Sequence, residues 1–162
     1  MDGRIVVGVD GSPSSRSALR WAVEEAGFRR TEVEAVLVWH VDNGMVIGPI
    51  SADLAAGTDP ERACDDWRAV LDDVVAEIGA ETGAEIRTVL AEGDPREVLT
   101  KASADAALLV VGTRGVGLIR EVLLGSVSSY CVHHAHCPVV VIREPKPERT
   151  EPKPVLTPGP LL

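Results

Sequence analysis

Five small residues in one stretch have the types and spacing that suit a phosphate group: Gly112, Gly115, Gly117, Gly125 and Ser126. Glycines lack a Cβ, so their backbone N–H groups can approach a ligand closely. Gly125 and Ser126 open an expected helix, where free N–H groups and the positive end of the dipole favour an anion. The stretch is therefore either a phosphate cradle or a structural turn that only needs glycines.

Two familiar phosphate loops are excluded by their spacing. The chain contains no Gly-x4-Gly-Lys-Ser/Thr sequence, so the stretch is not a Walker loop. The pair Gly115 and Gly117 lacks the third glycine of the dinucleotide fingerprint. A phosphate-binding loop in this stretch would therefore have to belong to a different class.

The longer spacing, Gly-x2-Gly-x9-Gly-Ser starting at Gly112, resembles the nucleotide-binding signature of the universal stress protein family, in its ATP-binding branch. Residues 5–12 look like the first strand and turn of that family, and residues 137–142 look like its last strand. The resemblance covers residues 3–143, apart from an unmatched insert at 43–60.

The resemblance implies an adenine nucleotide site. Its phosphate and ribose loop would consist of Gly112, Thr113, Arg114, Gly115, Gly125, Ser126, Val127 and Ser128. The N–H groups of residues 126–128 and the Ser128 hydroxyl would reach phosphate oxygens. Its adenine site would be lined by Gly8, Val9, Asp10, Val41 and Gly93. The implied ligand is ATP, with Mg²⁺, and cAMP or AMP are alternatives.

Two charged residues of this set have more than one possible role. The Asp10 carboxylate can bond a ribose hydroxyl, bond the base, hold a water on Mg²⁺, or cap its own turn. Arg114 is either a charge-assisted phosphate contact or a solvated loop arginine. We assign no catalytic residue, because the sequence contains no recognisable motif that pairs a nucleophile with an adjacent base.

A histidine-rich segment near the end of the chain resembles a metal site in composition. It contains Cys131, His133, His134, His136 and Cys137. Thiolates and imidazoles suit zinc, but these residues would span a helix end and the start of a strand. Histidines at a helix C-terminus also complement its dipole, so we favour that role and leave the metal unassigned.

The hydrophobic pattern predicts strands that alternate with helices. The expected strands are residues 4–9, 33–41, 86–91, 106–111 and 139–142. Expected helices start at Ser12-Pro13, Asp59-Pro60, Asp94-Pro95 and Ser126, and residues 42–58 are expected to form a loop.

This alternation predicts an α/β fold, with one doubly wound, five-stranded parallel sheet and helices on both faces. We expect the strand order 3-2-1-4-5. The resemblance also implies this arrangement, which is Rossmann-like and similar to that of the adenine-nucleotide alpha-hydrolases. In that order the turns at residues 10–12 and 112–117 meet where the winding reverses, which is where such sheets bind ligands.

Composition restricts the function further. The net charge is −9, which argues against a nucleic-acid binder or a protein of anionic membrane surfaces. Three cysteines without a spacing motif indicate reduced thiols, and no apolar run approaches ~18 residues. We therefore expect a cytoplasmic protein with no membrane span.

We expect one domain over residues 1–143 and a Pro-rich, disordered tail over residues 144–162, which contains six prolines and equal numbers of acidic and basic residues. The strand Val139–Ile142 is wholly apolar and would lie at the sheet edge. A bare apolar edge invites pairing, so we expect a homodimer through it, as the resemblance also implies.

Three functions fit these observations. The first is an ATP-binding universal stress protein that acts as a sensor or regulator, with slow or no hydrolysis. The second is an ATP-dependent hydrolase or transferase on the same fold. The third is a nucleotide-free interaction module in which the glycines are only structural.

Overall fold

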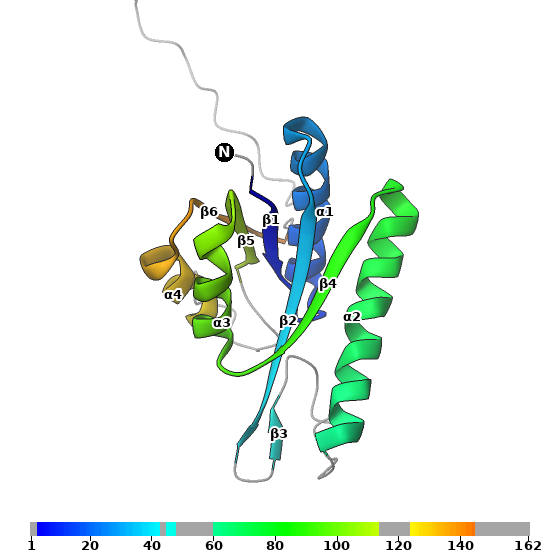
Figure 1. The fold of residues 1–162 in the computed structure, drawn as a ribbon, viewed down its shortest axis with the longest axis vertical. Helices are drawn as coiled ribbons and strands as arrows, with labels where there is room; N and C mark the ends of the chain where they lie inside the picture. The colour runs from blue at the N-terminus through cyan, green and yellow to red at the C-terminus, as the bar shows by residue number, and fades with distance from the viewer. Residues whose placement is uncertain (1–2, 43–44, 48–59, 114–123, 145–162) are drawn as a thin grey trace, which may run out of the picture.

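The computed structural model describes residues 3–42, 45–47, 60–113 and 124–144. The elements in chain order are β1 (Ile5–Gly8), α1 (Pro13–Arg29), β2 (Val33–Asp42), β3 (Met45–Ile47), α2 (Pro60–Thr82), β4 (Ile86–Glu92), α3 (Pro95–Ala102), the 3-10 helix η1 (Ser103–Asp105), β5 (Leu108–Gly112), α4 (Ser126–His134) and β6 (Val139–Ile142) (Figure 1). Within the described residues, no helix combines the length and the hydropathy needed to cross a bilayer.

Five strands pair in parallel in the order β4-β2-β1-β5-β6. Numbered along the chain, these strands give the order 3-2-1-4-5, so the predicted sheet is confirmed. Val7 of β1 pairs with Ala35 of β2 on one side and with Val110 of β5 on the other. The first strand is therefore central, and the winding reverses between β1 and β5.

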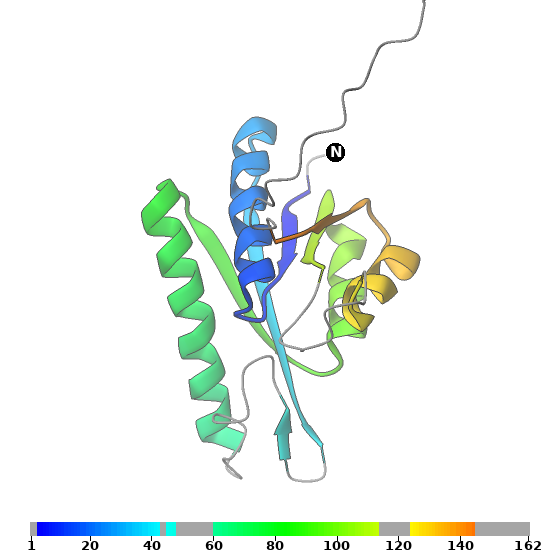
Figure 2. The same cartoon turned by 180° about the vertical axis from the view of Figure 1, so that it is seen from behind.

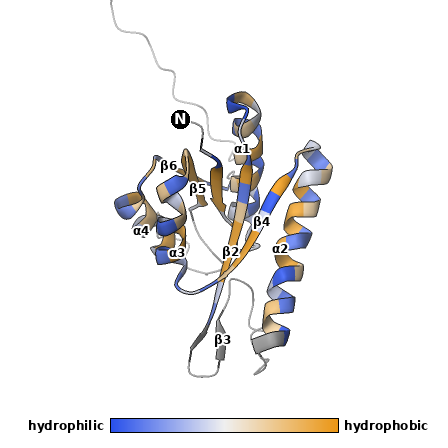
Figure 3. Cartoon of the chain, in the orientation of Figure 1, coloured by the Kyte–Doolittle hydropathy of each residue, from blue (hydrophilic) through white to orange (hydrophobic). Residues whose placement is uncertain are grey.

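Helices cover both faces of the sheet. α1 and α2 lie on one face, and α3 and α4 lie on the other (Figures 1 and 2). Side chains alternate along a strand, so Ile5 and Val7 pack with Trp67 of α2, while Val6 packs with Leu99 of α3. Figure 3 shows the same division, with apolar strands inside and helices whose outer faces are polar.

Two helices start where the sequence predicts, for the expected physical reason. The Ser12 Oγ accepts a hydrogen bond from the Ser15 N–H at 3.2 Å and caps α1. The Asp94 Oδ1 accepts one from the Arg96 N–H at 2.8 Å and caps α3. In both cases a proline follows the cap, where its missing N–H costs no hydrogen bond.

Several strand boundaries differ by one residue from the sequence-based expectation, and two larger differences concern β3 and β5. The expectation of a loop over residues 42–58 is wrong for residue 42, which ends β2, and for residues 45–47, which form β3 and pair antiparallel with residues 40–42. The fourth parallel strand starts at Leu108 rather than at residue 106, because η1 precedes it, and it ends at Gly112. Gly112 therefore belongs to β5 and pairs with Ile142 of β6, whereas it was expected in the turn.

Candidate functional site

The carboxyl ends of β1 and β5 lie side by side at the point where the winding reverses. Open α/β sheets bind their ligands at such a switch point. Three described segments that the sequence analysis singled out come to this edge of the sheet. They are residues 8–10 at the end of β1, residues 112–113 at the end of β5, and residues 125–128 at the start of α4.

The turn from β1 into α1 is held by its own side chains. Gly11 has a φ of 77°, a backbone conformation that a residue with a Cβ rarely adopts. The Asp10 Oδ1 accepts a hydrogen bond from the Ser12 N–H at 2.9 Å, and the Asp10 N–H donates to the Ser15 Oγ at 3.3 Å. Of the roles open to Asp10, capping its own turn is the one that the fold uses.

Gly112 has a structural reason to be glycine. A Cβ at this position would overlap the Ser14 Oγ and lie 3.0 Å from the Ser14 carbonyl carbon, in the first turn of α1. Real Cβ atoms avoid such close contacts with backbone, so β5 can pack against α1 only without a side chain here. The glycine is required by the fold whether or not a ligand binds.

Gly125 has no such reason in its backbone. It is the N-cap of α4, with φ −70° and ψ 166°, values that any residue adopts. Its N–H donates to the Thr113 carbonyl oxygen at 2.7 Å, which ties the start of α4 to the end of β5. Unlike α1 and α3, α4 has a cap residue without a side-chain acceptor, so within the described residues no cap side chain bonds its first-turn N–H groups.

Ser128 connects α4 to β5 from inside the fold. Its hydroxyl donates to the Gly112 carbonyl oxygen at 2.7 Å, and the residue is 4% exposed. The hydroxyl expected to reach a phosphate therefore already bonds the strand. The contribution of this turn to an anion site comes from the backbone N–H groups of Ser126, Val127 and Ser128.

Of the remaining predicted residues, Gly93 lies at the same edge and Val41 lies well beyond it. Gly93 has a φ of 143°, and its N–H donates to the Trp39 carbonyl oxygen at 2.8 Å, which joins the end of β4 to β2. Val41 lies in the part of β2 that pairs with β3, five residues beyond the residue that pairs with Gly8. At 3.3 Å per residue this is about 16 Å along the strand. Arg114, Gly115 and Gly117 lie outside the described residues.

A cluster that the sequence analysis missed joins α3 to α4. The Arg96 Nε lies 3.0 Å and 3.1 Å from the two carboxylate oxygens of Asp94, and the Arg96 Cζ lies 5.8 Å from the centre of the Tyr130 ring. Tyr130 in turn stacks on His134, with ring centres 4.0 Å apart. The Arg96 guanidinium holds the pKa of the Asp94 carboxyl below its usual range, so that carboxylate stays ionised.

The histidine-rich segment is resolved as the end of α4 and the turn after it. His133 and His134 lie in the last turn of the helix, at the negative end of its dipole, where basic residues are favourable. Within the described residues, no three His, Cys, Asp or Glu side chains gather closely enough to hold a metal ion. Cys131 is fully buried, and burial raises the pKa of its thiol to about 11. Cys131 is therefore a core residue, and little of its thiol is ionised to thiolate at neutral pH.

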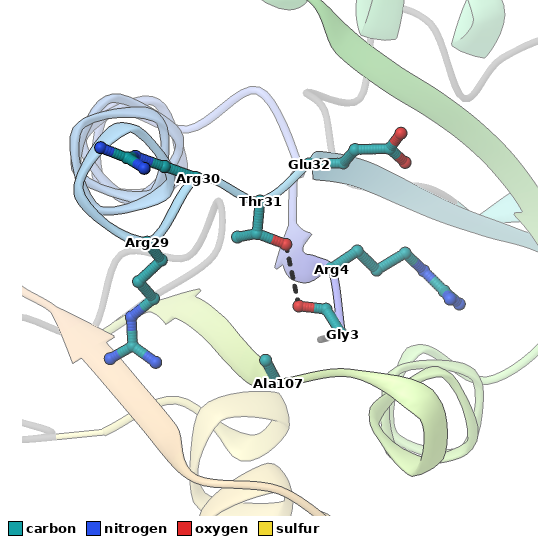
Figure 4. Close-up of a pocket in the computed structure, with 7 residues that line it drawn as sticks. All are labelled: Gly3, Arg4, Arg29, Arg30, Thr31, Glu32 and Ala107. Carbon is teal, nitrogen blue, oxygen red and sulfur yellow. Dashed lines mark hydrogen bonds between the residues drawn. The ribbon is translucent and has the colours of Figure 1, made fainter. Parts of the chain in front are cut away.

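A hollow of about 680 Å³ lies at the opposite, amino-terminal edge of the sheet. It is lined by Gly3, Arg4, Arg29, Arg30, Thr31, Glu32 and Ala107 (Figure 4). Arg29 and Arg30 lie at the C-terminus of α1, where cations offset the negative end of the helix dipole. Arg4 forms an ion pair with Glu34 at 2.9 Å, and the Thr31 hydroxyl donates to the Gly3 carbonyl oxygen. These residues have structural roles, and we assign this hollow no ligand.

Comparison with known proteins agrees with this architecture. The model of the universal stress protein family matches residues 1–143. Universal stress protein Rv2623 of Mycobacterium tuberculosis is 36% identical over 144 residues, which are 86% of this chain and 47% of that protein. The chain thus spans about half the length of the mycobacterial relatives that it matches.

Solved structures of single-domain length match most of the chain. The universal stress protein of Archaeoglobus fulgidus in complex with dAMP is 26% identical, with a TM-score of 0.63 over 88% of this chain and 99% of that one. A universal stress protein family protein of Arabidopsis thaliana with AMP bound is 25% identical, with a TM-score of 0.55 over 88% of this chain and 92% of that one. With the family model matching nearly all of the described fold, the chain belongs to the universal stress protein family.

Proposed function

We propose that this chain binds ATP, together with Mg²⁺, at the carboxyl edge between β1 and β5. The observation that carries the proposal is the start of α4, where Gly125 leaves the first-turn N–H groups without a side-chain cap. Such a helix start binds phosphate through its N–H groups and its dipole. The dAMP and AMP complexes of the two related proteins support an adenine nucleotide as the ligand class.

The nucleotide would lie along this edge in a fixed direction. Its phosphates would accept hydrogen bonds from the N–H groups of residues 126–128, with Arg114 and Gly115 completing the loop. Its ribose and adenine would extend past residues 8–10 towards the backbone of Val41, with Gly93 closing the edge of the adenine site. Because the Asp10 Oδ1 serves the turn, we assign the other carboxylate oxygen to a ribose hydroxyl or to a water on Mg²⁺.

We propose that ATP acts as a regulatory ligand and is hydrolysed slowly or not at all. A general base must be able to accept a proton from water near the phosphate. One Asp10 oxygen bonds its own turn, and we assign the other to the ribose or to a water on Mg²⁺, not to the water that would attack the phosphate. This arrangement favours a sensor over a hydrolase.

We also propose a homodimer in the cytoplasm that pairs through β6. In the described part of the chain, β6 pairs with β5 on one side and with no strand on the other. Its four apolar residues are all only partly buried, and such an edge is normally covered. A Val140→Lys variant that is folded by circular dichroism should sediment as a monomer; a dimer that persists would place the contact elsewhere.

Three measurements test the nucleotide proposal. Native mass spectrometry of the purified protein should show a co-purified adenine nucleotide, and titration calorimetry should rank ATP, cAMP and AMP. Incubation with Mg-ATP should release ADP slowly or not at all. Rapid turnover would instead support a hydrolase or transferase, and a protein that binds no nucleotide would support an interaction module.

A further inference from the structure

We propose that Arg96 contacts the terminal phosphates of a nucleotide bound at the start of α4, and so makes the site prefer triphosphates and diphosphates over monophosphates. This inference rests on the proposed nucleotide function and assigns a role to a residue outside the glycine signature. It predicts a ligand class, adenine nucleotides with a β-phosphate or longer chain.

The position of Arg96 follows from the way α3 and α4 start. Both helices follow parallel strands, so both begin at the carboxyl edge, and they lie side by side (Figure 1). Arg96 is the second residue of α3, and its Cζ lies 5.8 Å from the centre of the Tyr130 ring. Tyr130 is five residues beyond the Gly125 cap, or about 7.5 Å along the helix at 1.5 Å per residue. The guanidinium therefore lies beside α4, about one and a half turns beyond the Gly125 cap.

The present partner of Arg96 is one that a phosphate can replace. Asp94 and Arg96 form an exposed ion pair, with 33% and 49% of their side chains accessible to solvent. Exposed pairs of this kind contribute little in water, because both ions stay hydrated. A phosphate carries more charge than a carboxylate and accepts two parallel hydrogen bonds from one guanidinium. A nucleotide at α4 would therefore compete well for Arg96.

Three other arginines of the described fold form ion pairs with glutamates. Arg16 and Arg20 bridge α1 to Glu77 of α2, and Arg20 also bonds Glu81 at 2.7 Å. Arg29 pairs with Glu25 at 2.6 Å, one turn earlier on α1, at the amino-terminal edge. Arg29 is a matched control, because it is an exposed arginine in an exposed ion pair that lies at the other end of the sheet.

The experiment measures how affinity depends on the number of phosphates. Wild type, Arg96→Gln, Arg96→Lys and Arg29→Gln are titrated with ATP, ADP, AMP and adenosine in Mg²⁺ buffer by calorimetry. Losing a hydrogen bond to a charged group weakens binding about 10- to 100-fold. Arg96→Gln should therefore lose about that factor for ATP, less for ADP, and less than about 3-fold for AMP and adenosine. Arg96→Lys should recover part of the loss, and Arg29→Gln should match wild type.

The outcomes separate this inference from the proposed function. If wild type binds ATP and Arg96→Gln binds it equally well, Arg96 does not touch the phosphates and this inference fails alone. An equal loss for ATP and adenosine would also overturn it, since the residue would then act through the fold. A wild type that binds none of the four ligands would overturn the proposed function and this inference together.

Discussion

Gly112→Ala is expected to destabilise the fold even though the added group is a single methyl. The new Cβ would overlap the Ser14 Oγ and lie 3.0 Å from the Ser14 carbonyl carbon and 3.1 Å from the carbonyl oxygen. Two of these atoms are backbone in the first turn of α1 and have no rotamer to change. The strain must be relieved by moving β5 away from α1.

Overpacking of this kind costs about 1–3 kcal/mol. For a chain of this size, each kcal/mol shifts the unfolding midpoint by about 2–4 °C, so the variant should melt roughly 2–12 °C below wild type. Thermal and urea unfolding followed by circular dichroism measure this loss directly. Both should show the decrease without any nucleotide present.

Gly27→Ala is the matched control. Gly27 lies inside α1, and a Cβ there would meet no atom within 4 Å. Replacing a helical glycine by alanine stabilises by about 0.5–1 kcal/mol, so this variant should melt slightly above wild type. A Gly112→Ala protein as stable as wild type would show that β5 is not packed against α1 as closely as described.

Two further predictions concern titratable groups. Cys131 has a pKa of about 11 and no exposed surface, so it should resist a disulfide reagent at pH 8 until the protein unfolds. The partly exposed Cys64 should react in the native state. Labelling of Cys131 in the native protein as fast as in urea would contradict its burial. Arg96 lowers the pKa of Asp94 in the folded protein, so the ionised carboxylate stabilises the fold at pH values above the ordinary pKa of about 3.9. This contribution is lost as the pH falls through the lower pKa that Asp94 has in the folded state. Asp94→Asn, which keeps a capping side chain, should therefore lose less stability than wild type between pH 6 and pH 3 in urea titrations; identical losses would mean that the pair contributes nothing.

Much of the fold could be predicted because its signals are local. Ser12-Pro13 and Asp94-Pro95 each combine a side-chain cap with a residue that lacks an N–H, and both helices start there. The apolar run that became β1 is buried on both faces, as a central parallel strand must be. Alternation of such strands with helices then leaves few possible strand orders.

The differences arise where the cause is distant in the sequence. The three residues of β3 carry no clear strand pattern, and they are a strand only because residues 40–42 supply the partner. Gly112 follows a buried strand, which predicts a ligand turn, but the reason for its missing side chain is Ser14, almost a hundred residues earlier. The Arg96–Tyr130 contact likewise exists only because α3 and α4 are neighbours in the fold.

The central claim is that phosphates bind at the uncapped start of α4, and a thermal shift with Mg-ATP tests it most directly. At about 100 times its dissociation constant, a ligand stabilises the native state by about 2.7 kcal/mol, which corresponds to a rise of roughly 5–10 °C. Wild type should show this rise. Gly125→Glu should not, because it places a side chain and a negative charge at the proposed anion site, while the φ of −70° at this position is one that any residue adopts.

Gly27→Glu introduces the same charge on an open face of α1 and should respond to ATP as wild type does. The account therefore predicts a midpoint that rises with Mg-ATP in wild type and Gly27→Glu and stays constant in Gly125→Glu. An equal rise in all three proteins would contradict it and would place the phosphates away from α4.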